Sequence, residues 1–363
     1  MKIASIETIP LRIPFEHNGK QQVLGTKGWN LMDMCIVKVT TDNGLVGWGD
    51  AFSFHCLDAV KAAVDHMIAP ALIGEDARDI ARISHMLQQK NHLFGRYGIT
   101  MHAISGVDIA LWDIAGKAAG LPLAQLLGGN AETKLEGYSS LFLLRDVDAV
   151  VGDVKRSLDE GYRYIKLHEI GEAEVAAARG VAGDEIKIMV DTNCPWTPAE
   201  AMRMAVTLDQ YDLYWLEEPI FPPEDFASLA RVREQTGVPL AAGENWCTSF
   251  QFAQAFDAGA VDFAQPSVTK VGGISEFRKV ASVAEARGVQ IMPHCPYFGP
   301  GFIASLHLAA SLANPGLVER FYIDLEAEPY ADWTKGKNGY FDVPTGPGLG
   351  VEPDLDVLKD YRV

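Results

Sequence analysis

The feature that most constrains this fold is a regular alternation, after Gly129, of short apolar runs with amphipathic stretches. The eight runs are LEGYSSL, RYIKLH, IKIMVD, LYWLEEP, VPLAAGE, VDFAQPS, VQIMPH and LVERFYI. From Tyr138 to Phe321, reference residues in successive runs are 22 to 28 positions apart. This spacing is typical of strand-plus-helix units, and eight nearly equal units favour an α/β fold of the (β/α)8 barrel type. A doubly wound open sheet would show the same alternation, but no GxGxxG follows an early run.

The first part of the chain has a different pattern. Two alternating runs, IASIETIPLRI and MCIVKVTTDNGLVGWGD, flank a polar stretch from Glu16 to Asn30 and predict two antiparallel strands around a loop. Residues 58–74, 79–94 and 101–120 then show a period of 3.6 and predict helices. We therefore predict an N-terminal α+β domain at residues 1–125, a barrel at 126–330, and a Gly- and Pro-rich tail at 331–363 that packs back on the first domain.

Composition excludes several classes of partner. With 48 acidic and 31 basic residues, the formal charge is −17, which disfavours nucleic acid and anionic membranes. The N-terminal residues lack a charged segment followed by an apolar one, and no apolar run of about 18 residues occurs, so we expect a cytoplasmic protein. The five cysteines are scattered without CxxC spacing, which predicts free thiols.

Three consecutive predicted strands end in a carboxylate. Asp191, Glu217 and Glu244 are 26 and 27 residues apart, and neighbouring strand ends lie about 5 Å apart. Carboxylates this close repel unless a hard cation neutralises them, and ligands that are all oxygen favour Mg²⁺ or Mn²⁺. The alternative is three unrelated exposed acids that cap helices.

Basic side chains are expected beside this acidic cluster. Lys166 and His168 lie two residues apart at the end of the second strand, so both should face the barrel centre. His294 ends the seventh strand, across the barrel mouth. Bases on opposite sides of one site suggest proton transfer on both faces of a carbon. Glu319, on the eighth strand, is a fourth acidic candidate, unless it only pairs with Arg320 or another neighbour.

A series of motifs then resembles a known family. SGVDIALWDIAGKAAGLPLAQLLGG at residues 105–129 is followed by VDTN, WLEEP, GENW and TKVGG in order. Across essentially the whole chain, this series resembles the enolase superfamily, of the mandelate racemase and muconate lactonizing enzyme type. The resemblance implies a capping domain whose loops, at residues 15–29 and 52–55, close over the site. It also implies one Mg²⁺ per subunit, or Mn²⁺, with these site residues: metal ligands Asp191, Glu217 and Glu244; catalytic residues Lys166, His168, His294 and Glu319; and substrate contacts Asn193, Lys270, Tyr138, Ser267 and Trp29.

Two departures from the family pattern affect the expected roles. His168 stands where the family usually has a lysine base, and a histidine with a pKa near 6.5 is suited to that role at pH 7. We expect His168 to be the base beside a cationic Lys166, while the reverse assignment stays open. Ser267 stands where an aspartate usually pairs with the seventh-strand histidine. A serine supplies no charge, so His294 should be a weaker base and can act as an acid.

The expected function is Mg²⁺-dependent dehydration of a sugar acid to a 2-keto-3-deoxy acid. The polar residues in the stretch from Glu16 to Asn30 suit a polyhydroxylated substrate. Trp29, Phe52 and Phe54 are also compatible with an apolar substrate. The alternatives are a racemase, epimerase or lactone cycloisomerase that returns the proton, and a degenerate barrel without catalysis. We expect a small carboxylate as the partner and, from the resemblance, a homo-oligomer. The polar loop residues are His17, Asn18, Lys20, Gln21 and Gln22.

Overall fold

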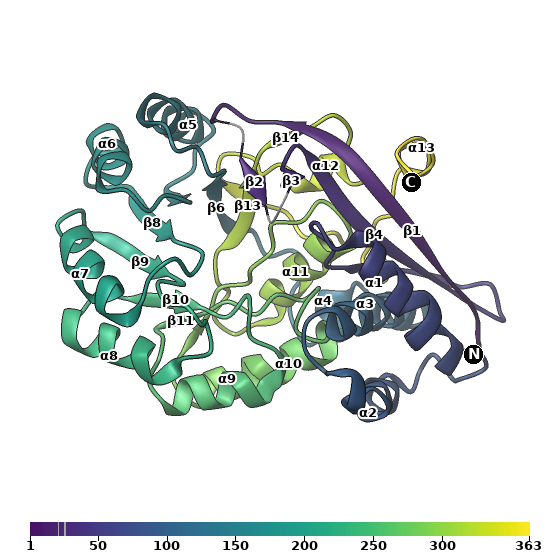
Figure 1. Ribbon diagram of the computed structural model, residues 1–363. Coiled ribbons are helices and arrows are strands. Elements are labelled where there is room, and N and C mark those ends of the chain that lie inside the picture. The colour runs from purple at the N-terminus through teal and green to yellow at the C-terminus, as the bar shows by residue number, and fades with distance from the viewer. Residues whose placement is uncertain (21, 25–26) are drawn as a thin grey trace.

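A sheet of eight parallel strands forms the centre of the computed structural model, which describes residues 1–20, 22–24 and 27–363 (Figure 1). Its strand order runs from β12 down to β6 and then to β13, so the last strand returns beside the first. β13 and β6 pair in parallel from Val318 opposite Gly137 to Tyr322 opposite Leu141. The predicted barrel-type fold with an N-terminal α+β domain is confirmed. The strands are β6 (Leu135–Leu141), β7 (Tyr164–Leu167), β8 (Lys187–Asp191), β9 (Leu213–Glu217), β10 (Leu240–Ala242), β11 (Phe263–Ala264), β12 (Gln290–Ile291) and β13 (Val318–Tyr322).

Between β12 and β13 the ring is closed by packing. Within the described residues no ladder joins these two strands, but the Leu317 N–H donates to Met292 Sδ at 3.2 Å. A Cβ on Gly316 would lie 2.0 Å from the Ile291 carbonyl oxygen, so glycine permits this close approach. The sheet is therefore a barrel with one seam that lacks backbone hydrogen bonds.

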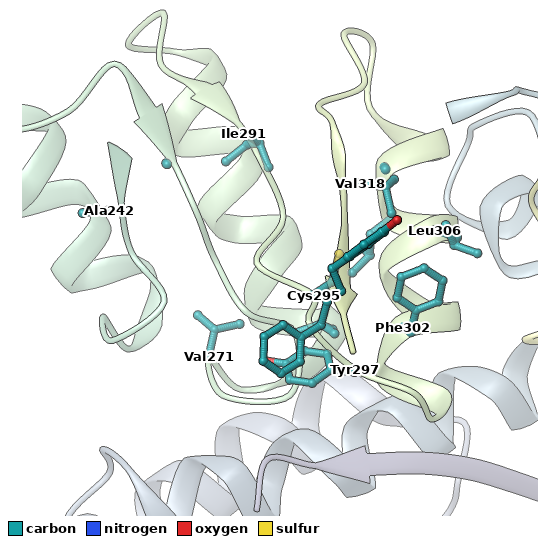
Figure 2. Packing of buried hydrophobic residues seen from close by; sticks show 14 of the residues in the cluster. Ala242, Val271, Ile291, Cys295, Tyr297, Phe302, Leu306 and Val318 are labelled. Carbon is teal, nitrogen blue, oxygen red and sulfur yellow. The ribbon is translucent and has the colours of Figure 1, made fainter. Parts of the chain in front are cut away.

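A helix follows each strand from β6 to β12 and covers the outside of the sheet (Figure 1). Side-chain caps fix where several of these helices begin. Asp146 accepts hydrogen bonds from the Asp148 and Ala149 N–H groups, and Thr197 forms a capping box with Glu200. Apolar side chains from strands, loops and helices fill the space between the layers, among them Val271, Ile291, Phe302 and Val318 (Figure 2). The helices are α5 (Val147–Asp159), α6 (Glu172–Ala182), α7 (Pro198–Asp209), α8 (Phe226–Thr236), α9 (Thr248–Asp257), α10 (Gly273–Glu285) and α11 (Pro300–Ser311).

The N-terminal domain packs an antiparallel sheet on helices. Its long strands are β1 (Ile3–Glu16), β4 (Leu31–Thr41) and β5 (Val46–Ala51). The prediction of two strands was wrong, because the second run turns back at Asn43-Gly44, where Gly44 has φ +86°. The polar stretch also contains a short pair, β2 (Val23–Leu24) with β3 (Lys27–Gly28). The predicted helices form as α1 (Leu57–Ala63) with its continuation η1 (Val64–Ile68) and η2 (Ala69–Ala71), α2 (Ile80–Lys90), followed by η3 (His92–Phe94), and α3 (Ile99–Ala119).

Helix α3 lies unusually close to the sheet of this domain. A Cβ on Gly49 would lie 1.8 Å from the Gly106 carbonyl oxygen, so the backbones of β5 and α3 nearly touch. The buried carboxylate of Asp113 on α3 accepts from the Trp48 N–H at 2.9 Å and the Leu349 N–H at 2.7 Å. This helix thus ties the sheet to the C-terminal tail.

The tail contacts both parts of the chain. β15 (Tyr340–Phe341) pairs with β6 of the barrel, whereas the Tyr361 carbonyl accepts from the Arg12 N–H on β1 at 3.1 Å. β14 (Asp324–Leu325), from within the predicted barrel range, joins the N-terminal sheet beside β1. The boundaries at 125 and 330 stay predictions. The remaining helices are α4 (Leu123–Leu126), α12 (Ala331–Thr334) and α13 (Leu355–Asp360). Across the described ranges, every helix is too short or too polar to span a lipid bilayer.

Candidate active site

A cavity of about 630 Å³ lies at the carboxyl ends of the barrel strands, under the N-terminal domain. This is where barrel folds hold their reacting groups. A larger hollow of about 890 Å³ lies between α10 and the start of β12, but no histidine lines it among the described residues. The smaller cavity combines histidines with carboxylates and is the candidate site. Barrel residues His168, Asn193, Glu244, Lys270, His294 and Glu319 face Trp29, Phe52, Phe54, His55 and His102 of the N-terminal domain across it.

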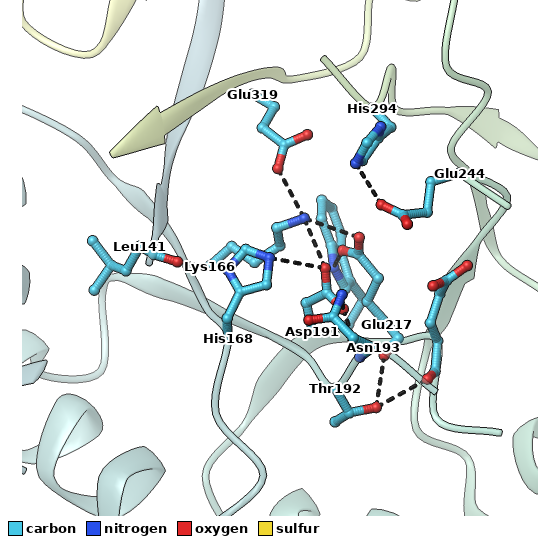
Figure 3. A network of polar contacts seen from close by, with 12 residues as sticks. Leu141, Lys166, His168, Asp191, Thr192, Asn193, Glu217, Glu244, His294 and Glu319 are labelled. Atoms are coloured by element: carbon cyan, nitrogen blue, oxygen red, sulfur yellow. Dashed lines mark hydrogen bonds and ion pairs between the residues drawn. The ribbon is translucent and has the colours of Figure 1, made fainter. Parts of the chain in front are cut away.

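Lys166 lies at the base of this site and holds three carboxylates (Figure 3). Its Nζ is 2.9 Å from Glu217 Oε1, 2.9 Å from Glu319 Oε1 and 3.2 Å from Asp191 Oδ2, and the side chain is fully buried. Burial opposes the charge, but these carboxylates raise the pKa of Lys166 well above its ordinary value. Lys166 is therefore an ammonium group that joins three strands.

His168 lies on the same side of β7 as Lys166, as strand alternation predicts. Its Nδ1 is 2.5 Å from the Leu141 carbonyl oxygen, which can only accept, so Nδ1 carries a proton. Its Nε2 is 3.2 Å from Asp191 Oδ2 (Figure 3). The Leu141 contact thus fixes the ring and makes Nε2 the nitrogen that is open to the site.

The three carboxylates proposed as metal ligands lie at or just beyond the carboxyl ends of β8, β9 and β10. Asp191 and Glu217 are register partners, and the next strand brings Glu244 to the same edge. Lys166 holds the first two, while Glu244 contacts His294 Nε2. Among the described residues, no three acidic, histidine or cysteine side chains surround one point. The structure therefore brings these three carboxylates to one region of the site, but their oxygen atoms do not surround a single point.

Two further polar groups complete this region, and only the first was predicted from the sequence. Asn193 has φ +53°, and its N–H and Nδ2 each lie 3.0 Å from Asp191 Oδ1. Glu218 is buried and accepts from Asn245 Nδ2 at 2.9 Å. Burial, with the nearby Glu244, raises the pKa of Glu218 well above its ordinary value. In the sequence WLEEP, Glu218 directly follows Glu217, and this pair of glutamates could have identified Glu218 as a site residue.

On the opposite side, His294 does not contact Ser267 directly. Ser267 Oγ contacts the Tyr297 hydroxyl, which lies 3.3 Å from His294 Nδ1. Tyr297 was not predicted as a site residue, although it follows the seventh strand in HCPYFGPG. Glu319, beside these groups, accepts from the Cys295 N–H at 3.0 Å.

The structure divides the predicted substrate contacts into two groups. Asn193, Lys270 and Trp29 line the cavity. Tyr138 and Ser267 are buried behind its walls: Tyr138 packs edge-on against Trp215 and lies 5.7 Å from Lys166 Nζ, measured to the ring centroid. These two side chains support the groups above them.

The polar loop of the N-terminal domain is bonded to the barrel. Asn18 Nδ2 donates to Asp153 Oδ1 at 2.6 Å, and Lys20 Nζ donates to the Arg145 carbonyl at 3.0 Å. Of the polar residues noted in the sequence, Gln22 lines the cavity, and Gln21 lies outside the described residues. The polar side chains of this loop therefore mainly anchor it.

Aromatic rings form the wall nearest this loop. The Trp29 ring lies 5.0 Å from that of Phe142 and 5.8 Å from that of Phe321, which joins the N-terminal domain to β13. Phe54 also contacts Trp29, at 6.0 Å between centroids. The substrate would thus meet charged groups on one side and aromatic rings on the other.

Known proteins resemble this chain over nearly its whole length. D-galactarolactone cycloisomerase of Agrobacterium fabrum is 33% identical over 349 residues, which cover 90% of this chain and 91% of that protein. Arabinonate dehydratase of Saccharolobus solfataricus is 32% identical and covers 95% of both. A racemase from Streptomyces coelicolor, solved with bound magnesium, superimposes with a TM-score of 0.89 at 31% identity, covering 99% of this chain and all of that one.

Two family models match in the expected order. Residues 21–128 match the N-terminal domain of mandelate racemase and muconate lactonizing enzyme, and residues 149–357 match the enolase C-terminal domain-like family. With a barrel whose strand ends carry carboxylates and histidines, the chain belongs to the mandelate racemase and muconate lactonizing enzyme family of the enolase superfamily.

Proposed function

We propose that this protein uses Mg²⁺ to abstract the proton α to the carboxylate of a sugar acid and dehydrates that acid to a 2-keto-3-deoxy acid. One observation carries the proposal: His168 and His294 face one carboxylate-rich cavity from opposite sides, each with Nδ1 hydrogen-bonded away from it. Relatives named as dehydratases and cycloisomerases support the substrate class.

The donor groups fit a divalent cation. The region holds more carboxyl groups than lysines, and a hard cation bound there would favour their ionised forms. Asp191, Glu217 and Glu244 would hold one Mg²⁺, or Mn²⁺, after moving from Lys166 and His294. When bound, the ion supplies a Lewis acid that stabilises negative charge on the substrate carboxylate. The carboxylates are Asp191, Glu217, Glu218, Glu244 and Glu319, and the lysines are Lys166 and Lys270.

His168 is the better placed base. Its Nδ1 proton is held by Leu141, which leaves Nε2 to take the α-proton. Lys166 also pairs with Glu319, which is not one of the proposed metal ligands, and a neutral amine there would leave that carboxylate without its cation. We therefore assign proton abstraction to His168 and stabilisation of the developing enediolate charge to Lys166.

Elimination needs an acid on the other side. As the enediolate collapses, its electrons form the Cα=Cβ double bond of an enol, the β C–O bond breaks, and His294 Nε2 protonates the departing hydroxide to water. The enol then tautomerises to the keto acid. Glu319, whose carboxylate is fixed by Lys166 and Cys295, borders the substrate carboxylate.

A cycloisomerase or epimerase is the second candidate, because the same abstraction followed by proton return needs the same groups. The aromatic wall around Trp29 favours it for a cyclic substrate, whose C–H face can stack on rings. A barrel without catalysis would show a melting temperature indifferent to Mg²⁺ and EDTA.

The test is a screen of sugar acids with Mg²⁺ in D₂O. We expect keto-acid formation. Deuterium in recovered, isomerised substrate without any keto acid would overturn dehydration in favour of isomerisation. His168→Asn should abolish α-proton exchange, and the exposed His85→Asn serves as the matched control. Lys166→Met should retain measurable exchange, and the reverse pattern would show that Lys166 is the base.

A further inference from the structure

Glu169 is a buried carboxylate beside the site that the proposed chemistry does not use. It follows His168 just beyond β7, and 1% of its surface is exposed. Its Oε1 accepts from the Leu144 N–H at 2.8 Å and from the Arg145 N–H at 2.9 Å, and its Oε2 lies 3.4 Å from Arg145 Nη1. A buried group that accepts two backbone N–H bonds fixes the chain that carries them.

The chain held in this way is the segment 142–146, which joins β6 to α5 and borders the cavity. Leu143 of this segment lines the cavity. Arg145 has φ +50°, a left-handed conformation that residues other than glycine rarely adopt. Such a backbone persists only where its surroundings hold it, and the hydrogen bonds to Glu169 do so here.

The same segment holds the loop of the N-terminal domain. The Leu144 carbonyl accepts from the Lys20 N–H at 3.2 Å, and the Arg145 carbonyl accepts from Lys20 Nζ at 3.0 Å. Gly19 lies so close that a Cβ there would be 2.6 Å from Leu144 Cα. The contacts of Lys20 therefore depend on where Glu169 places these two carbonyl groups.

From Lys20, hydrogen bonds continue to the cavity wall. Gln22 Nε2 donates to the Lys20 carbonyl at 2.8 Å, and the Gln22 carbonyl accepts from the Trp29 N–H at 2.9 Å. Gln22 and Trp29 both line the cavity. A connected series of hydrogen bonds thus leads from Glu169 of the barrel to the wall that the N-terminal domain contributes.

We propose that Glu169 is a positioning residue that fixes the segment 142–146 and so holds the loop at residues 17–20 over the substrate cavity. Only its kinetic consequence rests on the proposed function. Burial raises the pKa of Glu169 above its ordinary value, while the Arg145 and Leu144 N–H groups oppose that shift. The segment needs an oxygen acceptor at this place, and a neutral amide oxygen should serve as well as a carboxylate.

This role separates substrate binding from chemistry. Leu141, whose carbonyl oxygen contacts His168 Nδ1, belongs to β6 and pairs with Tyr322 on β13, so its place does not depend on Glu169. Loss of Glu169 should loosen the loop and leave the base in position. With a substrate from the sugar-acid screen, Glu169→Ala should therefore raise KM about tenfold and change kcat less than about threefold.

Limited proteolysis of the Mg²⁺-loaded protein tests the positioning role without turnover. Trypsin cleaves after Lys20 and Arg145, and mass spectrometry gives the rate at each site. In Glu169→Ala both rates should rise about tenfold, because cleavage follows the population of the opened loop. Glu169→Gln keeps the acceptor oxygen and should match the unmodified protein in both assays. Glu169→Asp keeps the charge but withdraws the carboxylate by one methylene, so it should resemble Glu169→Ala and replaces it if that variant does not fold.

The control is Asp262→Ala at the opposite end of the barrel. Asp262 directly precedes β11, accepts from the Leu240 N–H at 3.0 Å and pairs with Arg233. It thus resembles Glu169 in its chemistry but lies at the amino ends of the strands. Asp262→Ala should lower the melting temperature and leave KM and both cleavage rates unchanged.

Three results would overturn the proposal. They are unchanged cleavage in Glu169→Ala, equal acceleration in Asp262→Ala, and a Glu169→Gln variant that is cleaved as fast as Glu169→Ala. The expected cleavage rates without activity on any sugar acid would instead count against the proposed function and leave the positioning role intact.

Discussion

The stability of the fold should depend on pH through His307, a fully buried histidine on α11 far from the proposed chemistry. Its Nδ1 accepts from the Ala124 N–H, and its Nε2 donates to the Leu349 carbonyl, both at 3.1 Å. The neutral ring therefore links three segments: α4, α11 and the C-terminal tail. Protonation would add a buried charge and remove the acceptor for Ala124.

The magnitude follows from the pKa. Burial lowers the pKa of His307 from 6.5 to about 4. Because the folded state holds the proton less tightly than the unfolded chain, the stabilisation is present above pH 6.5 and is lost as the pH falls towards 4. The full shift corresponds to about 3 kcal/mol. About 2 kcal/mol of it should disappear between pH 7.5 and pH 5.

The perturbation is His307→Asn, which keeps an acceptor for Ala124 but cannot be protonated. At pH 7.5 the variant should be less stable, since it loses the bond to Leu349 and some packing volume. The free energies of unfolding of the two proteins should then converge by about 2 kcal/mol at pH 5. Urea unfolding, followed by tryptophan fluorescence at fixed protein and Mg²⁺ concentrations, measures this difference.

The control is His85→Asn, on the exposed face of α2. Its unfolding free energy should run parallel to that of the unmodified protein across the same pH range. If the gap between His307→Asn and the unmodified protein stays constant from pH 7.5 to pH 5, then His307 is not a buried neutral base and the reasoning fails.

Two other changes test the N-terminal domain. Asn18→Ala removes the hydrogen bond to Asp153 that anchors the loop preceding Trp29. Steady-state kinetics should show KM raised about tenfold with little change in kcat. An unchanged KM would mean that this hydrogen bond does not position the loop. Gly49→Ala places a Cβ 1.8 Å from the Gly106 carbonyl oxygen and should lower the free energy of unfolding by more than about 3 kcal/mol. The control Gly152→Ala, on α5, places a Cβ with no atom within 4 Å and should raise it by about 0.5 kcal/mol. Thermal melts that ranked the two variants the other way would contradict the close packing of β5 on α3.

The barrel could be predicted because its signal is repeated. Each of the eight apolar runs is bounded by a helix of similar length, so an error in one unit would not have hidden the period. The strand-end positions of Asp191 and Glu217 followed from the same period. The first domain has no such repetition. There, Asn43-Gly44 was an available hairpin signal, and it was missed because the alternation continues on both sides of it.

The contacts within the site were harder to predict, because they depend on residues that are distant in the sequence. Lys166 could be placed on a strand, but its three ion pairs require side chains 25, 51 and 153 positions away to converge. The polar residues of the loop suggested a hydrophilic pocket. Instead, Asn18 and Lys20 bond to the barrel surface, since a bond partner there satisfies them as well as a substrate would.

The two histidines show what the structure adds to a motif. The sequence places His168 and His294 at opposite strand ends but cannot say which ring nitrogen is available. The structure shows what lies beside Nδ1 of each ring: a backbone carbonyl of β6 for His168, and the phenol of Tyr297 for His294. A carbonyl has no sequence signature at all, and a tyrosine three residues past a histidine has many other roles. Both histidines nevertheless point the same nitrogen at the cavity. His168 lies beside Asp191 and His294 beside Glu244, so each ring presents Nε2 to a carboxylate.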